Sequence, residues 1–311
     1  MNIVDKHFYA LTDHLKNLSL QEIYQNTRSL FLNLPLHTQQ SISKFLNNFP
    51  YWGEINIDDN NFEELYNRAK MLKEHLNDLI WLYENLEDYR SKKTLFAILN
   101  NLYQFDFFTL KHSIETTYPH YFDLDIISAN DDEVFVDLGA YTGDTIQEYL
   151  TYFDNKYKKI YAYEITKESL HIMKKNLAKE KNIKYSSKAI IDSKKELHFL
   201  KSKIDNSANQ INLKGTDKIK ATSLDLDIKE KITMIKMDIE GSEYQALLGS
   251  KKHIQNDKPK LLISVYHNHE DLYRIPKLIK KFEPNYKFYL RYYGNEVFPT
   301  EIVLIATCEQ N

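Results

Sequence analysis

Two glycines and two acids follow a short apolar run near the middle of the chain. The run at 133–136 leads into Asp137, Gly139, Gly143 and Asp144, and a helical pattern comes next. This order predicts a strand, a tight turn and a helix, the arrangement that binds ligands at the carboxyl edge of a parallel sheet. The chain has only seven glycines. Two of them in one turn indicate a close backbone approach or a positive φ there.

The turn suits a ligand with a cationic end better than a polyphosphate. A dinucleotide fingerprint needs a glycine where this chain has Tyr141, because the pyrophosphate lies against bare backbone. The acids would also repel a polyanion, whereas they suit the ammonium and sulfonium of S-adenosylmethionine. We therefore predict S-adenosylmethionine as the cofactor. The predicted binding residues in this turn are Asp137, Gly139, Tyr141, Gly143, Asp144 and Thr145.

Two later segments add to this cofactor site. A second apolar run, 160–163, ends at Glu164. A carboxylate at the tip of the strand beside the glycine turn can accept hydrogen bonds from both ribose hydroxyls of an adenosine. The run 188–192 places small and apolar residues, among them Ala189, where an adenine ring would stack. Glu164 and Ala189 complete the predicted cofactor-binding set.

A further strand pattern at 232–238 carries polar residues with a special spacing. Lys236 and Asp238 share one face of this strand, because side chains alternate with a period of two. Glu240 and Gly241 follow, and Glu243 lies in the first turn of the next predicted helix, where an acid suits the positive helix end.

These residues resemble the FkbM family of S-adenosylmethionine-dependent methyltransferases over about residues 118–311. The segment from Lys236 to Glu243, with the pattern K-x-D-x-E-G-x-E, is the most specific part. The resemblance implies a class I methyltransferase fold with seven strands and, most often, O-methylation of a sugar or related hydroxyl. Segments 262–272 and 286–293 resemble a bacterial subgroup found with surface-polysaccharide genes, which implies a role in capsule polysaccharide biosynthesis. One departure is Tyr266-His267, where many members carry an acid.

That departure leaves the catalytic base open. Asp238 could accept the proton of an alcohol acceptor or ligate a divalent cation that lowers the hydroxyl's pKa. His267 follows the neighbouring strand and has the pKa range of a base at neutral pH; Lys236 completes the predicted catalytic set. Asp238, Glu240 and His267 are also candidate metal ligands. The structural alternatives are a helix cap or a pair with Lys236 for Asp238, and a polar contact for His267.

Composition excludes several function classes. The net charge is −3, so no general field favours nucleic acid. The single cysteine, Cys308, excludes an intramolecular disulfide and fits a reducing compartment. No signal peptide opens the sequence, and the apolar runs are far shorter than the ~20 residues that span a bilayer. We expect a cytoplasmic protein.

The chain is predicted to divide into a helical domain, 1–117, and a methyltransferase domain, 118–311. Apolar residues recur at helical spacing over 62–86, which predicts one long helix, and again over 95–103. Residues 118–132 form a polar link. The helical domain would help to cover the acceptor site or mediate pairing as a homodimer.

In the second domain, strands alternate with helices, which predicts a doubly wound α/β sheet with right-handed crossovers. The final strand pair is expected to form an antiparallel edge hairpin. A ribbon near 198–201 and a polar loop at 205–210 interrupt the alternation. The strands are expected at about 133–138, 160–164, 183–190, 232–238, 260–266, 286–293 and 301–307, and the helices near 143–153, 167–180, 242–254 and 270–282.

The pattern as a whole favours an O-methyltransferase that acts on a sugar hydroxyl, either of a nucleotide-sugar or of a surface glycan precursor. Arg274 and Arg291 are candidates for gripping an acceptor phosphate, with exposed ion pairing as the alternative. Two rival functions stay open. One is a nicotinamide-dependent sugar-nucleotide enzyme, and the other is a non-catalytic methyltransferase fold that acts as an interaction module.

Overall fold

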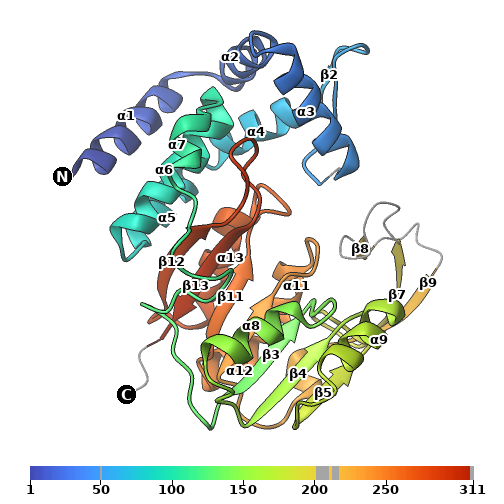
Figure 1. The fold of residues 1–311 in the computed structure, drawn as a ribbon. Helices are drawn as coiled ribbons and strands as arrows, with labels where there is room; N and C mark the ends of the chain where they lie inside the picture. Colours follow the sequence, from blue (N-terminus) through green and yellow to red (C-terminus); the bar gives the residue numbers. More distant parts are fainter. Residues whose placement is uncertain (50, 201–209, 212–216, 309–311) are drawn as a thin grey trace. The chain divides into compact units, whose positions relative to one another are not determined.

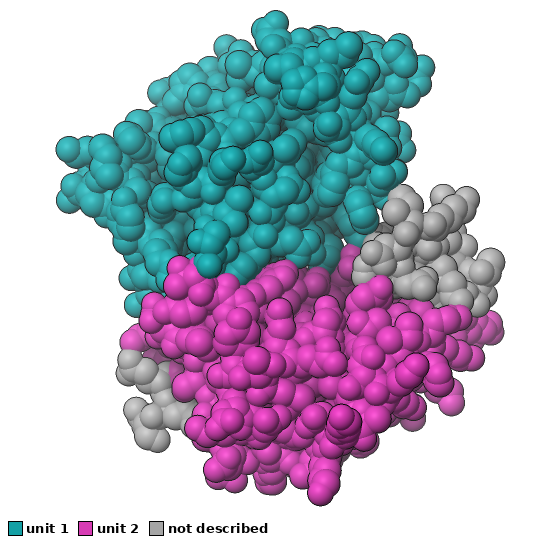
Figure 2. Space-filling model, in the orientation of Figure 1, with its two compact units in different colours: residues 1–116, 265–276, 288–304 teal, residues 117–264, 277–287, 305–311 magenta. Residues whose placement is uncertain are grey.

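The computed structural model describes residues 1–49, 51–200, 210–211 and 217–308 (Figure 1). The chain forms two compact units. Unit 1 contains residues 1–116, 265–276 and 288–304, and unit 2 contains residues 117–264, 277–287 and 305–311 (Figure 2). Unit 1 thus combines the N-terminal helices with two segments from the end of the chain. The division into domains 1–117 and 118–311 stays a prediction.

Unit 1 is mainly helical, as the sequence predicts. Its first two helices begin with capping boxes at Asn2 and Ser19, whose side chains accept backbone N–H bonds from the first turn. A short hairpin follows the third helix. The elements are α1 (Ile3–Asn17), α2 (Leu20–Leu32), α3 (Leu36–Asn48), β1 (Ile55–Asn56), β2 (Asn61–Phe62), α4 (Glu63–Glu74), α5 (Leu76–Asn85), α6 (Tyr89–Gln104) and α7 (Phe107–Lys111).

The prediction of one long helix over 62–86 is wrong, because the structure has two helices, α4 and α5, that meet at His75. The backbone of His75 leaves the helical region, with φ −114° and ψ 19°. Its ring bonds the carboxylate of Asp78 at 2.9 Å and stacks on Tyr273 with a centroid distance of 4.6 Å. A local side-chain bond and a tertiary ring contact thus outweigh a continuous apolar pattern. The helix expected over 95–103 is confirmed as part of α6.

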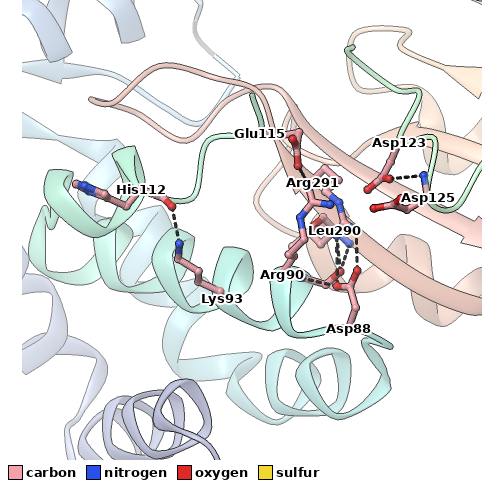
Figure 3. A network of polar contacts seen from close by, with 10 residues as sticks. Asp88, Arg90, Lys93, His112, Glu115, Asp123, Asp125, Leu290 and Arg291 are labelled. Atoms are coloured by element: carbon pink, nitrogen blue, oxygen red, sulfur yellow. Dashed lines mark hydrogen bonds and ion pairs between the residues drawn. The ribbon is translucent and has the colours of Figure 1, made fainter. Parts of the chain in front are cut away.

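A buried polar network joins α6 to strand β12 (Lys287–Tyr292) within unit 1. Asp88 caps α6 and pairs with Arg291 of β12 at 2.6 Å, as Figure 3 shows. The Ser91 hydroxyl accepts a bond from the Leu290 amide at 2.8 Å. Arg90 of the same helix forms an ion pair with Glu115. These contacts attach α6 to β12, which is the strand at one edge of the main sheet.

The main sheet has seven strands in the order β12-β13-β11-β10-β3-β4-β5. The pairs β11–β10, β10–β3, β3–β4 and β4–β5 are parallel. The C-terminal pair forms the expected antiparallel hairpin at one edge. The predicted doubly wound α/β sheet is therefore confirmed. The remaining strands are β3 (Val134–Leu138), β4 (Lys159–Tyr163), β5 (Ile183–Ser186), β10 (Met234–Met237), β11 (Lys260–Ser264) and β13 (Ile302–Thr307).

Helices follow the strands near the expected positions, with one correction. The helix expected over 242–254 is two helices, broken at Gly249. A Cβ at Gly249 would lie 1.9 Å from the Ile191 carbonyl oxygen, and Asp225 accepts bonds from the amides of Lys252 and His253 at the start of the second helix. In the view of Figure 1, α8 and α9 lie side by side in front of β3–β5. The helices are α8 (Asp144–Tyr152), α9 (Lys167–Asn176), α10 (Leu224–Asp227), α11 (Glu243–Leu248), α12 (Lys251–Asn256) and α13 (Asp271–Phe282).

A second, smaller sheet explains the irregular stretch before β10. Its order is β6-β9-β7-β8, with β6 (Ala189–Ile190), β7 (Lys195–Leu200), β8 (Gln210–Ile211) and β9 (Asp217–Thr222). The strand expected over 183–190 is thus two strands in different sheets. Residues 198–200 of the expected ribbon lie in β7, while position 201 and residues 205–209 of the expected loop lie outside the described residues. Across the described parts of the chain, no helix is long and apolar enough to cross a membrane.

Candidate active site

The turn between β3 and α8 touches the loop after β10. Gly139 has φ +81°, and a Cβ there would lie 1.8 Å from the carbonyl oxygen of Asp238. Its amide donates to the Tyr163 carbonyl at 3.0 Å, which draws the turn toward β4 as well. Gly143, with φ +84°, is the N-cap of α8. A Cβ there would lie 2.9 Å from side-chain atoms of Met173 in α9 and of Leu177, the C-cap of α9. Both glycines are therefore required by close packing and by backbone conformation.

A buried ion pair joins the two central strands beneath this turn. Lys236 of β10 and Asp137 of β3 are direct partners in the parallel register. The Lys236 ammonium lies 3.1 Å from Asp137 Oδ1 and donates to the Gly139 carbonyl at 2.8 Å. Burial alone would lower the pKa of Lys236, but the carboxylates of Asp137 and Asp238 outweigh it and raise that pKa above its usual value. Lys236 therefore keeps its proton and holds the turn.

Glu164 stands at the end of β4 with both carboxylate oxygens oriented by backbone amides. Oε2 accepts from the Tyr141 amide at 3.0 Å, and Oε1 accepts from the Thr166 amide at 2.6 Å. The side chain is almost fully buried, and this burial raises the pKa of Glu164. The Thr166 side chain bonds the carboxylate as well, and because a carboxylate has about four lone-pair sites, capacity for a further donor remains. The result is a fixed double acceptor beside the glycine turn.

Asp238 follows β10 and is bound by a tyrosine from the segment before β3. The Tyr121 hydroxyl donates to Asp238 Oδ2 at 2.6 Å and lies 3.3 Å from the hydroxyl of Ser264 at the end of β11. Tyr121 has φ +70°, and the Lys236 ammonium lies 5.3 Å from the centre of its ring. The ring of His120 stacks on Tyr121 with centroids 4.0 Å apart. Burial lowers the pKa of His120 to about 4.

The sequence prediction missed Tyr121 and His120, because it treated residues 118–132 as a polar link. The signal that was present is the cluster of rings, Tyr118, His120, Tyr121 and Phe122, in an otherwise polar stretch. Phe122 is fully buried against rings of β3 and α8. The link is thus anchored by packing, and this anchor brings Tyr121 to Asp238.

A hydrogen bond to the first residue of α11 stabilises the loop between β10 and α11. Glu240 has φ +57° and Gly241 has φ +92°, so the chain turns sharply after Asp238. The fully buried side chain of Glu243 accepts the Ile239 amide at 2.8 Å. Glu243 therefore closes the loop that presents Asp238.

A family model described as the methyltransferase FkbM domain matches residues 137–292. The chain belongs to the FkbM methyltransferase family. The matched segment contains the glycine turn, Glu164, and the stretch from Lys236 to Glu243. A search of the curated proteins found no match.

Among solved structures, the FkbM methyltransferase from Methylobacillus flagellatus is similar in fold, with a TM-score of 0.65 and 24% identity. The match covers 76% of this chain and 61% of that protein, so the chain spans less than two thirds of its length. An rRNA methylase from Streptococcus thermophilus matches with a TM-score of 0.38 and 15% identity, over 58% of this chain and 90% of that one. Fibrillarin from Aeropyrum pernix, solved with natively bound S-adenosyl-L-methionine, also has a TM-score of 0.38, with 10% identity over 58% of this chain and 67% of that one. The first match shows the class I methyltransferase fold.

The other predicted site residues lie in several places. Asp144 is exposed in the first turn of α8 and Thr145 beside it is buried. Ala189 is buried in the small sheet, in an apolar cluster of that sheet. His267 belongs to unit 1, where it is buried with its ring 5.4 Å from that of Tyr51. Asp238 and Glu240 belong to unit 2, so their predicted pairing with His267, and a metal site of these three, stay predictions.

The two arginines considered as phosphate ligands are engaged in ion pairs. Arg291 is buried and bonds Asp88 and Ser91, as Figure 3 shows for Asp88. Arg274 lies 2.6 Å from the buried carboxylate of Asp271. Neither arrangement favours binding of an acceptor phosphate, because a carboxylate already balances the charge of each arginine.

Proposed function

We propose that this member of the FkbM family is an S-adenosylmethionine-dependent O-methyltransferase that acts on a sugar hydroxyl. The observation that carries the cofactor part is the fixed carboxylate of Glu164 beside the glycine turn. A buried acceptor with two oriented oxygens fits a pair of vicinal hydroxyl donors, and an adenosyl ribose presents such a pair.

The residues around Glu164 fit the rest of that cofactor. The methionine part would lie at the turn from Gly139 to Gly143, whose backbone is fixed by its packing against the Asp238 carbonyl and α9. Asp137 is neutralised by Lys236, so the exposed carboxylate of Asp144 is the acid left to attract a cationic end. Ala189 would lie against the adenine. When bound, S-adenosylmethionine supplies the methyl group.

Asp238 is the proposed proton acceptor. Its carboxylate would take the proton of the acceptor hydroxyl, whose oxygen would bond the methyl carbon while the methyl–sulfur bond breaks and S-adenosylhomocysteine leaves. Tyr121 positions that carboxylate through the 2.6 Å bond to Oδ2. Lys236 keeps its proton and aligns β10 with the cofactor turn, so it acts as a positioning residue. His267 as a second base, and Asp238 as ligand of a divalent cation, are the alternatives that variants of these residues would reveal.

The finer parts of the proposal come from the sequence resemblance. They are a nucleotide-sugar or surface glycan precursor as acceptor, a role in capsule polysaccharide biosynthesis, a cytoplasmic location, and a homodimer paired through the helical region. Mass spectrometry of candidate acceptors, incubated with the protein and S-adenosylmethionine, tests the acceptor class through a gain of one methyl group.

Ligand-induced stabilisation separates the proposal from its rivals. We expect S-adenosylhomocysteine to raise the melting temperature and NAD(H) to leave it unchanged. Stabilisation by NAD(H) alone would favour the nicotinamide enzyme. Stabilisation by S-adenosylhomocysteine with no methyl transfer to any sugar or nucleotide-sugar would favour the non-catalytic interaction protein.

A further inference from the structure

Unit 2 contains a concentration of lysines that the net charge of the chain conceals. The chain as a whole has a net charge of −3, but residues 154–188 contain ten lysines and four acids, and one of these acids, Glu164, is buried. Two of the lysines form ion pairs, with Glu230 and Asp227. Seven others are exposed, and among the described residues none of the seven has an ion-pair partner. These seven form the lysine patch: Lys156, Lys158, Lys174, Lys175, Lys179, Lys181 and Lys184.

The fold brings the lysine patch together on the side of the main sheet where β4 and β5 begin. These two strands are parallel, and they begin at Lys159 and Ile183. Helix α9, which lies beside them in Figure 1, returns the chain to this side, and two of the lysines lie in its last turn. The Tyr157 hydroxyl donates to the Lys181 carbonyl at 2.8 Å, which joins the loop before β4 to the loop before β5. Glu164 follows the end of β4, so the lysine patch lies on the opposite side of the sheet from the cofactor turn.

Tyrosine rings hold two of these lysines in place. The Lys174 ammonium lies 5.7 Å from the centre of the Tyr185 ring, and the Lys184 ammonium lies 5.4 Å from that of Tyr161. Such cation–π contacts let the lysine stem lie on the ring while the charged end stays in water. Lys184 and Tyr185 point to opposite faces of β5, which is the outermost strand of the sheet. The lysine patch therefore continues around β5 from one face of the sheet to the other.

The residue types in the lysine patch favour a lipid surface over nucleic acid. None of the arginines of the chain lies in 154–188. Nucleic-acid recognition relies strongly on arginine, whose planar fork bonds phosphates and base edges in pairs. Lysines act as point charges, and clusters of about four to eight basic residues attract anionic lipid headgroups. Ile172 is 45% exposed one turn before Lys175 on the same face of α9, and an apolar side chain among lysines suits the boundary of a bilayer.

We propose that the lysine patch docks unit 2 on an anionic phospholipid surface. Charge complementarity carries this assignment, because seven cations without ion-pair partners meet a surface of negative sign. The ammonium groups lie over the headgroup phosphates, and the cofactor turn on the opposite side of the sheet stays clear of lipid. The contact is peripheral, so it needs no membrane-crossing helix. It uses unit 2 alone and does not depend on which acceptor is methylated.

Co-sedimentation with vesicles tests the docking directly. We expect the full chain to bind vesicles of phosphatidylcholine that contain phosphatidylglycerol, and not vesicles of phosphatidylcholine alone. Binding should weaken strongly as the salt concentration rises from about 0.1 M to about 1 M, because the Debye length falls from about 10 Å to about 3 Å. Equal binding to both kinds of vesicle, or no binding to either at about 0.1 M salt, would overturn the proposal.

Two sets of variants test which lysines are responsible. Each lysine near an anionic surface strengthens binding about fivefold. The triple variant Lys174→Gln/Lys175→Gln/Lys179→Gln should therefore lower the vesicle partition coefficient about a hundredfold, and Lys156→Gln/Lys158→Gln about twenty-five-fold. All five side chains are exposed, so both variants should unfold at the same urea concentration as the wild type. Unchanged partitioning of both folded variants would contradict the proposal.

A matched control separates the lysine patch from a general effect of charge. Lys6→Gln/Lys44→Gln/Lys70→Gln removes the same three charges from exposed lysines of unit 1. This protein should bind anionic vesicles as the wild type does. A loss equal to that of the triple variant in α9 and the loop after it would show that total charge, and not the lysine patch, determines the binding.

Competition tests nucleic acid as the alternative partner. We expect RNA, added at the same phosphate concentration as the phosphatidylglycerol, to leave the protein on the vesicles. Displacement by RNA, together with loss of RNA binding in Lys174→Gln/Lys175→Gln/Lys179→Gln, would assign the lysine patch to nucleic acid and overturn the lipid surface.

Discussion

Replacing Glu164 by Gln tests the cofactor site at its most constrained residue. The carboxylate accepts one backbone amide on each oxygen, from Tyr141 and from Thr166. A glutamine amide has a single acceptor oxygen, so its NH2 group must face one of these two donors. The lost bond to a charged group is worth about 1.5–3 kcal/mol. Burial already disfavours the charge, as the raised pKa of Glu164 shows, so we expect a net stability loss of about 1–2 kcal/mol.

The same substitution should weaken cofactor binding more than it weakens the fold. One ribose hydroxyl loses a charged acceptor, which at about 1.5–3 kcal/mol corresponds to roughly a tenfold to a hundredfold loss of affinity. Isothermal titration with S-adenosylhomocysteine measures this loss, and urea unfolding measures the stability. Glu148→Gln is the control, because Glu148 is an exposed acid of the adjacent helix α8. A folded Glu164→Gln protein with wild-type affinity would refute the assignment of Glu164 to the ribose.

Three further substitutions test the residues around Asp238. Tyr121→Phe should lower kcat about tenfold and leave the Kd for S-adenosylhomocysteine unchanged, because it removes a charge-assisted bond to the proton acceptor; an equal loss in both would contradict a positioning role. Lys236→Met should lower the free energy of unfolding by about 3–5 kcal/mol, because it leaves Asp137 buried without its partner. Adding Asp137→Asn should restore part of this stability. A loss below about 1 kcal/mol would show that the ion pair contributes little to the stability of the fold. His120 has a folded pKa of about 4 against an ordinary value of 6.5, so its contribution to stability is complete above about pH 6.5 and is lost as the pH falls toward 4. His120→Gln should therefore flatten the loss of stability between those pH values, and an unchanged slope in chemical unfolding at each pH would count against this reason.

The strands and the glycine turn could be predicted because their signals are local. Apolar runs that end in Asp137, Glu164 and Asp238 mark strand ends, and the spacing of Gly139 and Gly143 marks a turn that requires special backbone conformations. The family pattern from Lys236 to Glu243 is also contiguous. The structure places these segments at adjacent strands of one sheet, as the predicted doubly wound fold requires.

What the sequence could not supply depends on register and packing. The partner of Lys236 is set by the alignment of β10 with β3, which no local pattern encodes. Tyr121 reaches Asp238 from a segment with a positive φ and no periodicity. The break at His75 likewise comes from a ring contact with a distant residue, Tyr273, so the apolar pattern alone predicted one helix where two exist.

The close contact between Gly139 and the Asp238 carbonyl restricts the substitutions that this protein can accept at position 139. Any side chain at position 139 would push directly on the backbone that carries the proposed base. Mutations at this position should therefore alter donor affinity and turnover together. This turn therefore has almost no freedom to accept substitutions, because its backbone and the Asp238 carbonyl would have to move together.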